Sequence, residues 1–448
     1  MKRNLTRKET IVITSMLFGM FFGAENLIFP AMVGVSAGSN MWSAFAGVFI
    51  TAVGIPMLAV VGLGLSRSEG VVELANRVSP GYSRFFCTLL YLTIGPLFAI
   101  PRCASTSFSV GAVNLLPQNG ERLYLALFSL VFFAVVLYFS LKPGGIMTWI
   151  GKWLNPVFLV FLAVLVIAAL AKPISSISAV TPAQSYASSG VAFFRGCLEG
   201  YNTLDALAGL AFGIVVIDVV RESGISQPQR VAVSTAKAGV FSCLFMGLIY
   251  LFITLVCAQS APVCAGADNG GTVLGTIANH YFRSAGSVLM TLIVTFACLK
   301  TAIGLVTSCS KAFVDMYPKG PGYTVWAVVF SLVSFGIANF GLTTIVSWCV
   351  PVLMFLYPLA ITLILLSLSG RFIGTNQTIY RTTTAFTLIA AVFDMIGTIS
   401  GMVPGSQVLA GLKAFAGNIL PLYDLGLGWI LPAAIGFLVG LWRAKRKA

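Results

Sequence analysis

Charged residues stand inside long apolar stretches of the 448-residue sequence, among them Glu25, Arg102, Asp205 and Lys300. A charged side chain at the centre of a bilayer costs roughly 2.5–3.5 kcal/mol or more, so such residues face a partner or a water-filled cavity and mark functional sites. In this setting they could bind a small charged solute or an ion. The chain has no His-rich motif, nucleophile–base pair or metal-spaced cysteines, so we do not expect an intramembrane enzyme.

Two of these stretches are poor continuous helices. The stretch at 9–36 contains FFGAENLIFP (Phe21–Pro30), and the stretch at 189–220 contains EGYNTLDALAGLAFG (Glu199–Gly213). Unwound backbone inside a bilayer must line a cavity or be buried in protein. Paired interruptions in the two halves of a chain point to the binding site of a transporter. The alternative is that both stretches are Gly-rich packing faces.

An interrupted first helix has a chemical use. The N-terminus of its outer half, near Glu25 and Asn26, would present free amides to a carboxylate. The C-terminal ends of the inner halves would present carbonyls to an ammonium group or to Na⁺. A zwitterionic amino acid suits both, and apolar walls such as Phe22 and Leu204 suit an aliphatic side chain.

The composition indicates which elements must position these residues. The chain is 58% hydrophobic and only 9% charged, whereas a soluble domain has about 25% charged residues. This excludes a soluble enzyme, a disordered chain and a disulfide scaffold. The net charge of +14 is scattered between apolar runs, so we expect no nucleic-acid partner. The prediction is an all-α polytopic membrane protein.

Apolar segments long enough to cross a bilayer predict twelve transmembrane helices. They fall at about 9–36, 40–66, 83–112, 122–141, 149–171, 189–220, 232–259, 285–314, 322–340, 342–369, 381–402 and 426–443. Most of the 27 Lys and Arg residues, including Lys2, Arg3, Arg67 and Lys447, then fall on one side, which predicts that both termini are cytoplasmic. We expect the first segment to be a retained membrane helix and no signal peptide, because its apolar run continues to about Val35 and no small-residue cleavage site follows a short apolar core.

The sequence resembles the bacterial branched-chain amino acid:cation symporter family (LIVCS, BrnQ-type) over nearly its whole length. The stretches that carry the resemblance are GAENLIFPAMVG, GPLFAIPRCASTSFSVG, GYNTLDALAGLAFGIVV, CLKTAIGLVTSC and VPVLMFLYPLAI, in that order. The resemblance implies a single domain over 1–448 with the LeuT-like fold of the amino acid/polyamine/cation superfamily. Helices 1 and 6 are broken, two inverted repeats of five helices cover about 9–171 and 189–369, and two additional helices cover about 381–443.

The resemblance also implies a function. It is secondary active import of leucine, isoleucine and valine by alternating access, normally driven by Na⁺, across the bacterial cytoplasmic (inner) membrane. No phosphate-binding P-loop occurs, so we expect no ATP hydrolysis by this chain. The expected partners are the amino acid and the lipid bilayer, with no cofactor besides a possible Na⁺ and no obligatory protein partner. A channel is the competing class, and it predicts polar stripes along several spans.

The resemblance assigns Gly23, Ala24, Asn26, Thr203, Leu204 and Asp205 to the substrate site by position, and the other candidates come from their places in the same or neighbouring spans. The residues expected to line the substrate site are Phe22, Gly23, Ala24, Glu25, Asn26, Ser105, Tyr201, Thr203, Leu204, Asp205 and Thr301. One sodium ion would lie at Asn26 and Thr203, beside the substrate carboxylate. A second sodium site would use groups near Gly19, Phe22, Ile303 and Thr307.

Two departures from the family pattern make the coupling ion an open question. Glu25 stands where the family usually has Gly, and Lys300 stands where it usually has a small or apolar residue. We predict that the two form an ion pair and that the Lys300 ammonium replaces the second sodium ion. The alternatives are a static pair that leaves Na⁺ coupling intact, and a proton-coupled or uncoupled exchanger of another neutral amino acid such as methionine. For Arg102 we expect a counter-charge role towards Asp205 or Glu25, or a position facing a water-filled vestibule.

Overall fold

The computed structural model describes residues 5–66, 68, 70–112, 116, 120–267, 269–403 and 405–446. Those residues form helices and connecting turns, with no β-strand among them. Lys2, Arg3, Arg67 and Lys447, which contribute to the predicted charge asymmetry, lie outside the described residues.

The described residues of the first half of the bundle form nine α-helices. They are α1 (Arg7–Phe21), α2 (Glu25–Ala37), α3 (Met41–Val48), α4 (Ile55–Ser66), α5 (Val71–Asn76), α6 (Pro80–Leu92), α7 (Ala99–Thr106), α8 (Glu121–Ser140) and α9 (Asn155–Ala171). Wider π-helical turns join several of them: η2 (Phe49–Gly54), η3 (Thr93–Leu97), η4 (Ser107–Gly111) and η7 (Met147–Leu154).

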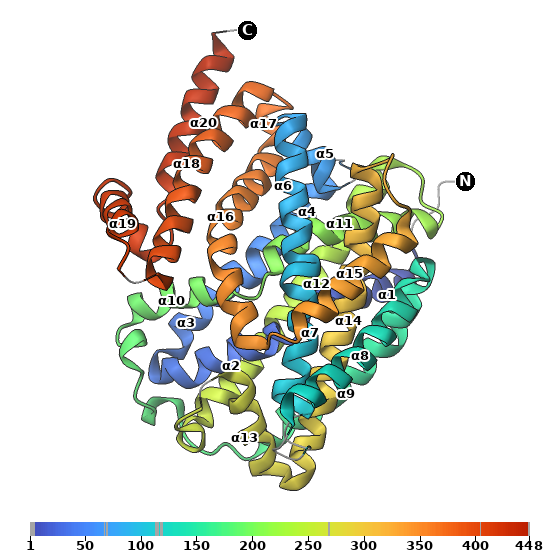
Figure 1. The fold of residues 1–448 in the computed structure, drawn as a ribbon, viewed down its shortest axis with the longest axis vertical. Coiled ribbons are helices and arrows are strands. Elements are labelled where there is room, and N and C mark those ends of the chain that lie inside the picture. The colour runs from blue at the N-terminus through green and yellow to red at the C-terminus, as the bar shows by residue number, and fades with distance from the viewer. Residues whose placement is uncertain are drawn as a thin grey trace.

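The second half follows a similar order. It contains α10 (Ser189–Tyr201), α11 (Asp205–Glu222), α12 (Pro228–Gln259), α13 (Gly270–Phe282), α14 (Ser284–Met316), α15 (Tyr323–Ala338) and α16 (Leu342–Leu368). The chain ends with α17 (Gly370–Ile373), α18 (Gln377–Met402), α19 (Gln407–Ile419) and α20 (Ile430–Lys445). Figure 1 shows α18, α19 and α20 at one side of the bundle, with α16 between them and the core.

Each of the twelve predicted spans coincides with helical segments. Within the described residues, nine helical runs are long and apolar enough to cross a membrane. α15 and α20 are shorter, with 16 residues each, and α1 has 15. The polytopic helical architecture is therefore confirmed, whereas the number of twelve stays a prediction.

Local sequence explains where several helices begin. Thr6 and Glu9 form a reciprocal capping box at the start of α1. The Ser79 hydroxyl caps α6. Pro80 occupies the first helical position, where its lack of an N–H leaves no amide without an acceptor. Ser188 caps α10 in the same way. Polar caps of this kind compensate the unpaired amides of a helix N-terminus.

Small residues let helices of the two halves touch backbone to backbone. Gly47 of α3 approaches the carbonyl of Phe193 in α10, and Gly196 of α10 approaches the carbonyl of Ala44 in α3, so neither glycine has room for a Cβ atom. Close crossings through small residues are the usual way in which membrane helices associate. This crossing fixes α10, the first part of the broken sixth span, against the second span.

The two ends of the bundle differ. Figure 1 shows α13 at one end, whereas the C-terminus, α5 and α17 lie at the other end, and the N-terminus lies toward that same end. α13 occupies most of 261–284, the segment between the predicted seventh and eighth spans. Two termini toward one end agree with an even number of crossings.

Candidate substrate and ion site

Both predicted helix breaks are present. α1 ends at Phe21 and α2 begins at Glu25, with the Gly23 amide donating to the Asn26 side-chain oxygen at 2.7 Å. α10 ends at Tyr201 and α11 begins after Leu204, whose φ of +63° is left-handed. A left-handed leucine costs about 1–2 kcal/mol, so packing around the break must hold it in place.

Asn26 and Asp205 join the two breaks. The Asn26 side-chain amide donates to both carboxylate oxygens of Asp205, at 3.0 and 2.8 Å. Tyr250 of α12 donates to the same carboxylate at 2.7 Å and also accepts from Asn26. Asn26 and Asp205 are each 1% exposed and Tyr250 is fully buried. A buried carboxyl group with three hydrogen-bonding contacts is held firmly beside the gap.

Arg102 connects the same two breaks from the third span. Its Nε lies 2.6 Å from Glu25 Oε1, and its Nη2 donates to the Asn202 carbonyl at 2.9 Å. The guanidinium also lies over the Phe29 ring, 5.7 Å from its centre. The buried arginine therefore satisfies the carboxylate at the start of α2 and the carbonyl at the end of α10. Of the partners considered for Arg102, the structure selects Glu25.

The predicted ion pair between Glu25 and Lys300 is wrong. The face of α14 that meets the first break carries Thr301, since a Cβ atom added to Gly23 would lie 3.2 Å from the Thr301 hydroxyl. Successive helix residues point about 100° apart, and Lys300 therefore points away, toward α9. There its Nζ donates to Asn155 Oδ1 at 3.1 Å. Glu25 pairs instead with Arg102, whose planar guanidinium group contacts the carboxylate directly.

An aromatic cage surrounds the Lys300 ammonium. Nζ lies 3.6 Å from the centre of the Phe158 ring, 5.5 Å from that of Phe18 and 5.9 Å from that of Phe22. Cation–π contacts strengthen when water is excluded, and Lys300 is fully buried. No carboxylate of the described residues pairs with it. The Lys300 side-chain nitrogen therefore lies among residues of α1, α9 and α14.

Two of the residues predicted for the second sodium site, Gly19 and Phe22, lie at the cage. Gly19 packs against Asn155, at 3.4 Å from the position of a Cβ atom, and Phe22 belongs to the cage itself. Ile303 and Thr307 lie one and two turns further along α14, and both are buried. The Thr203 hydroxyl, predicted for the other ion, donates to the Gly200 carbonyl at 2.8 Å.

A small cavity of about 20 Å³ lies where the two breaks meet α7 and α14. The predicted substrate residues that line it are Glu25, Asn26, Thr203, Leu204, Asp205 and Thr301. The apolar residues around them are Met20, Phe21, Ile94, Ala99, Cys103, Ala208, Phe212 and Leu305. A volume of this size holds about one water molecule, so a leucine side chain would have to displace lining side chains.

Other predicted substrate residues do not line this cavity. The Ser105 hydroxyl donates within its own helix to Pro101 and Arg102 carbonyls, at 3.2 and 3.3 Å. Tyr201 stacks on Tyr357 of α16 with ring centres 4.6 Å apart. Phe22, Gly23 and Ala24 lie in the break, behind the lining residues.

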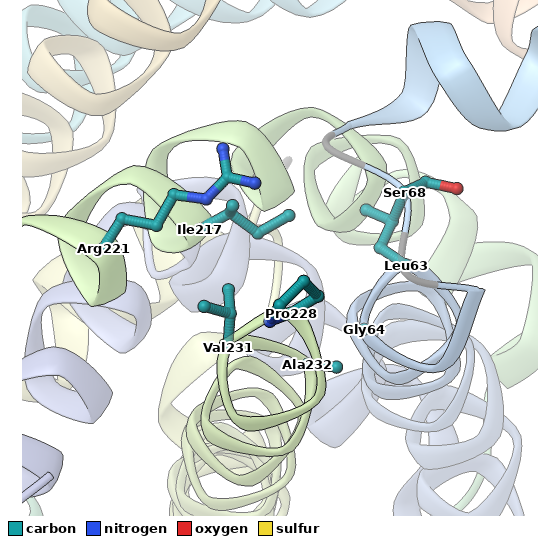
Figure 2. A pocket seen from close by; sticks show the side chains of 8 residues that line it. All are labelled: Leu63, Gly64, Ser68, Ile217, Arg221, Pro228, Val231 and Ala232. Carbon is teal, nitrogen blue, oxygen red and sulfur yellow. The ribbon is translucent and has the colours of Figure 1, made fainter. Parts of the chain in front are cut away.

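Sequence reasoning did not find Tyr250, Asn155 or Phe158. Tyr250 and Phe158 occur in apolar runs without a glycine or charge beside them, so no local signal distinguishes them from packing residues. Asn155 is a polar residue directly before Pro156 in an apolar run, and that signal could have found it. A further pocket of about 30 Å³ lies between α4, α11 and α12, and Figure 2 shows Arg221 and Ser68 at opposite sides of it. No predicted site residue lines that pocket.

Comparison with known proteins identifies the family. Residues 6–447 match the sequence profile of the branched-chain amino acid transport protein family. The chain belongs to this family. It is 49% identical over 440 residues to a branched-chain amino acid permease, BrnQ, of Lactobacillus delbrueckii subsp. lactis, covering 98% of this chain and 97% of the relative. It is 38% identical over 449 residues to the BrnQ permease of Bacillus subtilis (strain 168), covering 99% and 100%.

Solved structures confirm the fold of this branched-chain amino acid transport family member. Mhp1, a nucleobase-cation-symport-1 family transporter, superposes with a TM-score of 0.60 at 13% identity, covering 98% of this chain and 93% of that one. MhsT in complex with L-phenylalanine superposes with a TM-score of 0.57 at 14% identity, covering 99% of both. The LeuT-like fold expected from the resemblance is therefore confirmed, and the chain is a multi-pass membrane transporter and no enzyme.

Proposed function

We propose that this protein imports leucine, isoleucine and valine across the bacterial cytoplasmic membrane by alternating access. The observation that carries the proposal is the joining of the two helix breaks by Asn26 and Asp205 at a buried cavity. Membership of the branched-chain amino acid transport family, with two permeases among the relatives, supports the same substrate class.

The cavity offers both ends of an amino acid a partner. The first turn of α2 leaves amide groups without helical acceptors, and its dipole favours a carboxylate there. The Asp205 carboxyl group is the proposed partner of the substrate ammonium group. Phe21, Ile94 and Phe212 form apolar walls for a branched aliphatic side chain. A branched-chain amino acid is the zwitterion that suits this combination.

The Arg102–Glu25 contact suggests how access alternates. Arg102 holds the start of α2 and the end of α10 together through two separate atoms. Because the remaining cavity is about 20 Å³, a substrate can enter only when these elements separate. We therefore assign to Arg102 a positioning role between the two broken helices, without contact with the substrate.

For the coupling ion, we propose that the Lys300 ammonium occupies the role of the second sodium ion. A cation between α1 and α14 would hold the inner half of the first span to the eighth, and Lys300 provides a covalently attached one. The competing proposal is Na⁺ coupling at Asn26 and Thr203. A proton-coupled or uncoupled transporter of another neutral amino acid, such as methionine, is the third candidate, since Asp205 and Lys300 are both titratable.

Uptake into proteoliposomes separates these possibilities. The purified full-length chain is reconstituted, and labelled leucine uptake is measured with Na⁺ or with choline at fixed pH, with and without an inward proton gradient. Uptake that is undiminished in choline is the expected result, and strict Na⁺ dependence would eliminate the replacement by Lys300. Competition by unlabelled isoleucine and valine, but weakly by methionine, is expected. Leucine uptake equal to that of empty liposomes would refute the transport proposal itself.

A further inference from the structure

A groove of about 770 Å³ lies between α1, α9 and α12. It lies beside the Lys300 cage, because Phe18 and Asn155 belong to both. Its walls contain Arg7 of α1 and Lys237 of α12 together with several large apolar side chains. None of the substrate residues discussed above lines it, so it needs a separate explanation.

Charged and apolar groups are segregated along the groove. Lys237 stands one turn before Phe241 and two turns before Phe245 on α12, and Arg7 stands one turn before Ile11 on α1. With a rise of 1.5 Å per residue, the apolar wall extends about 12 Å beyond Lys237. The first and seventh spans are predicted to cross in the same direction, so both cations lie at the same, cytoplasmic, end.

The cations and the apolar side chains of the groove are both left exposed by the described part of the protein. Arg7 and Lys237 are exposed, and neither makes an ion pair or hydrogen bond with a described residue. At the other end Ile11 is 68% exposed, Phe241 56% and Phe245 41%. A free phosphate would use the cations but not the apolar wall, whereas an uncharged lipid tail would use only the wall. An amphiphile with an anionic head uses both.

We propose that this groove is a binding site for an anionic phospholipid of the bilayer. Its phosphate lies between Arg7 and Lys237, and an acyl chain follows Ile11, Phe241 and Phe245. Basic pockets between transmembrane helices on the cytoplasmic side bind anionic lipid headgroups, through the same charge complementarity. The cavity volume, the two unpaired cations and the apolar wall support one occupant of this chemistry.

The lipid would brace the inner half of the first broken helix. At the closed end of the groove, Ser242 of α12 donates to the Thr14 carbonyl at 2.8 Å. The Phe18 and Phe245 rings meet there with centres 4.9 Å apart. A lipid that bridges Arg7 and Lys237 adds a contact between α1 and α12 at the open end. Lipid composition would thus act on α1 directly.

Site-directed fluorescence quenching tests the proposal. All nine cysteines of the chain are free and buried, so a cysteine introduced at Phe241 can be labelled selectively with bimane. The full-length protein is placed in phosphatidylcholine vesicles that contain brominated phosphatidylglycerol or brominated phosphatidylcholine. We expect roughly a tenfold preference for phosphatidylglycerol at this label, and loss of that preference in the Arg7→Gln/Lys237→Gln variant.

Two controls make each outcome decisive. A label at Leu438 of α20, which is 65% exposed, should show no preference between the lipids. The Lys319→Gln/Lys445→Gln variant removes two exposed cations elsewhere and should keep the preference at Phe241→Cys. Equal quenching by both lipids would overturn the proposal, as would quenching by aqueous iodide alone, which indicates a water-filled vestibule. Because the readout is lipid contact, the result is independent of the proposed transport function.

Discussion

Asn26 donates from one side-chain nitrogen to both oxygens of Asp205, at 3.0 and 2.8 Å, across the gap between the first and sixth spans. The two residues are 179 positions apart in the chain, yet each lies in the first turn of the helix that follows a break. This contact joins the two breaks directly, and Arg102 joins them a second time through Glu25 and the Asn202 carbonyl. The Asp205 carboxyl group is the strongest candidate partner for a substrate ammonium.

Replacing Asp205 with Asn should abolish most transport. The change removes the negative charge and leaves the donors on Asn26 and Tyr250 with a poorer acceptor, which costs about 2 kcal/mol or more, since hydrogen bonds to charged groups contribute roughly 1.5–3 kcal/mol. We expect leucine uptake to fall at least tenfold. Asp218→Asn on the same helix is the matched control, because the Asp218–Lys311 pair is partly exposed and contributes about 1 kcal/mol or less. Uptake that survives Asp205→Asn unchanged would exclude Asp205 from the substrate site.

The Glu25–Arg102 pair should show strong coupling in a double-mutant cycle. Either Glu25→Gln or Arg102→Gln alone leaves one buried charge without its partner, a defect of about 3–5 kcal/mol for buried pairs. The double variant should recover a large part of the loss in thermal stability. The cycle between Glu25→Gly and Lys300→Ala should instead be additive, because Lys300 contacts Asn155 and not Glu25. Coupling in the second cycle and additivity in the first would contradict the observed pairing.

Glu25 and Lys300 also show how much of the site can be predicted from the sequence. Glycine, asparagine and proline inside apolar runs predicted both breaks and the residues in them, because such residues are unfavourable in a continuous membrane helix. The partner of Glu25 could not be read in this way, since it depends on the rotation of α14, which turns Thr301 to the break and Lys300 to α9.

A third break was not predicted at all. Gly95 has φ −91° and ψ −125°, and the third span bends there before α7 begins. A Cβ atom on Gly95 would lie 2.9 Å from the Cys309 sulfur of α14. The bend at GPLF (Gly95–Phe98) therefore has two causes, the proline and the close approach of α14 to Gly95. Only the tertiary structure shows the close approach. The bend places Arg102 at the depth of Glu25 and Asn202.

Removing the Lys300 ammonium should create a need for an external cation. In Lys300→Ala the place between the Phe158 ring and Asn155 is left without a positive charge. We expect leucine uptake to fall severalfold in choline and to be restored in part by Na⁺, whereas wild-type uptake does not change between the two salts. Lys300→Arg should not keep wild-type leucine uptake in choline, because a planar guanidinium group is larger than the lysine ammonium group that the aromatic rings enclose. A variant that loses uptake equally in both salts, while keeping its thermal stability, would argue against ion replacement.

The apolar wall of the cavity should set the size of the transported side chain. Leu305 is 2% exposed and lines the cavity, as Phe212 also does. Leu305→Ala creates space there, and one missing methylene contact changes discrimination by about 1–3 kcal/mol, or 10–200-fold. We therefore expect valine to compete less well and methionine better, measured as the ratio of half-inhibitory concentrations against labelled leucine. Leu438→Ala, at an exposed position of α20, controls for nonspecific effects of the same truncation. If the Leu305 variant keeps the wild-type ratio at normal stability, the substrate side chain must lie elsewhere than against this wall.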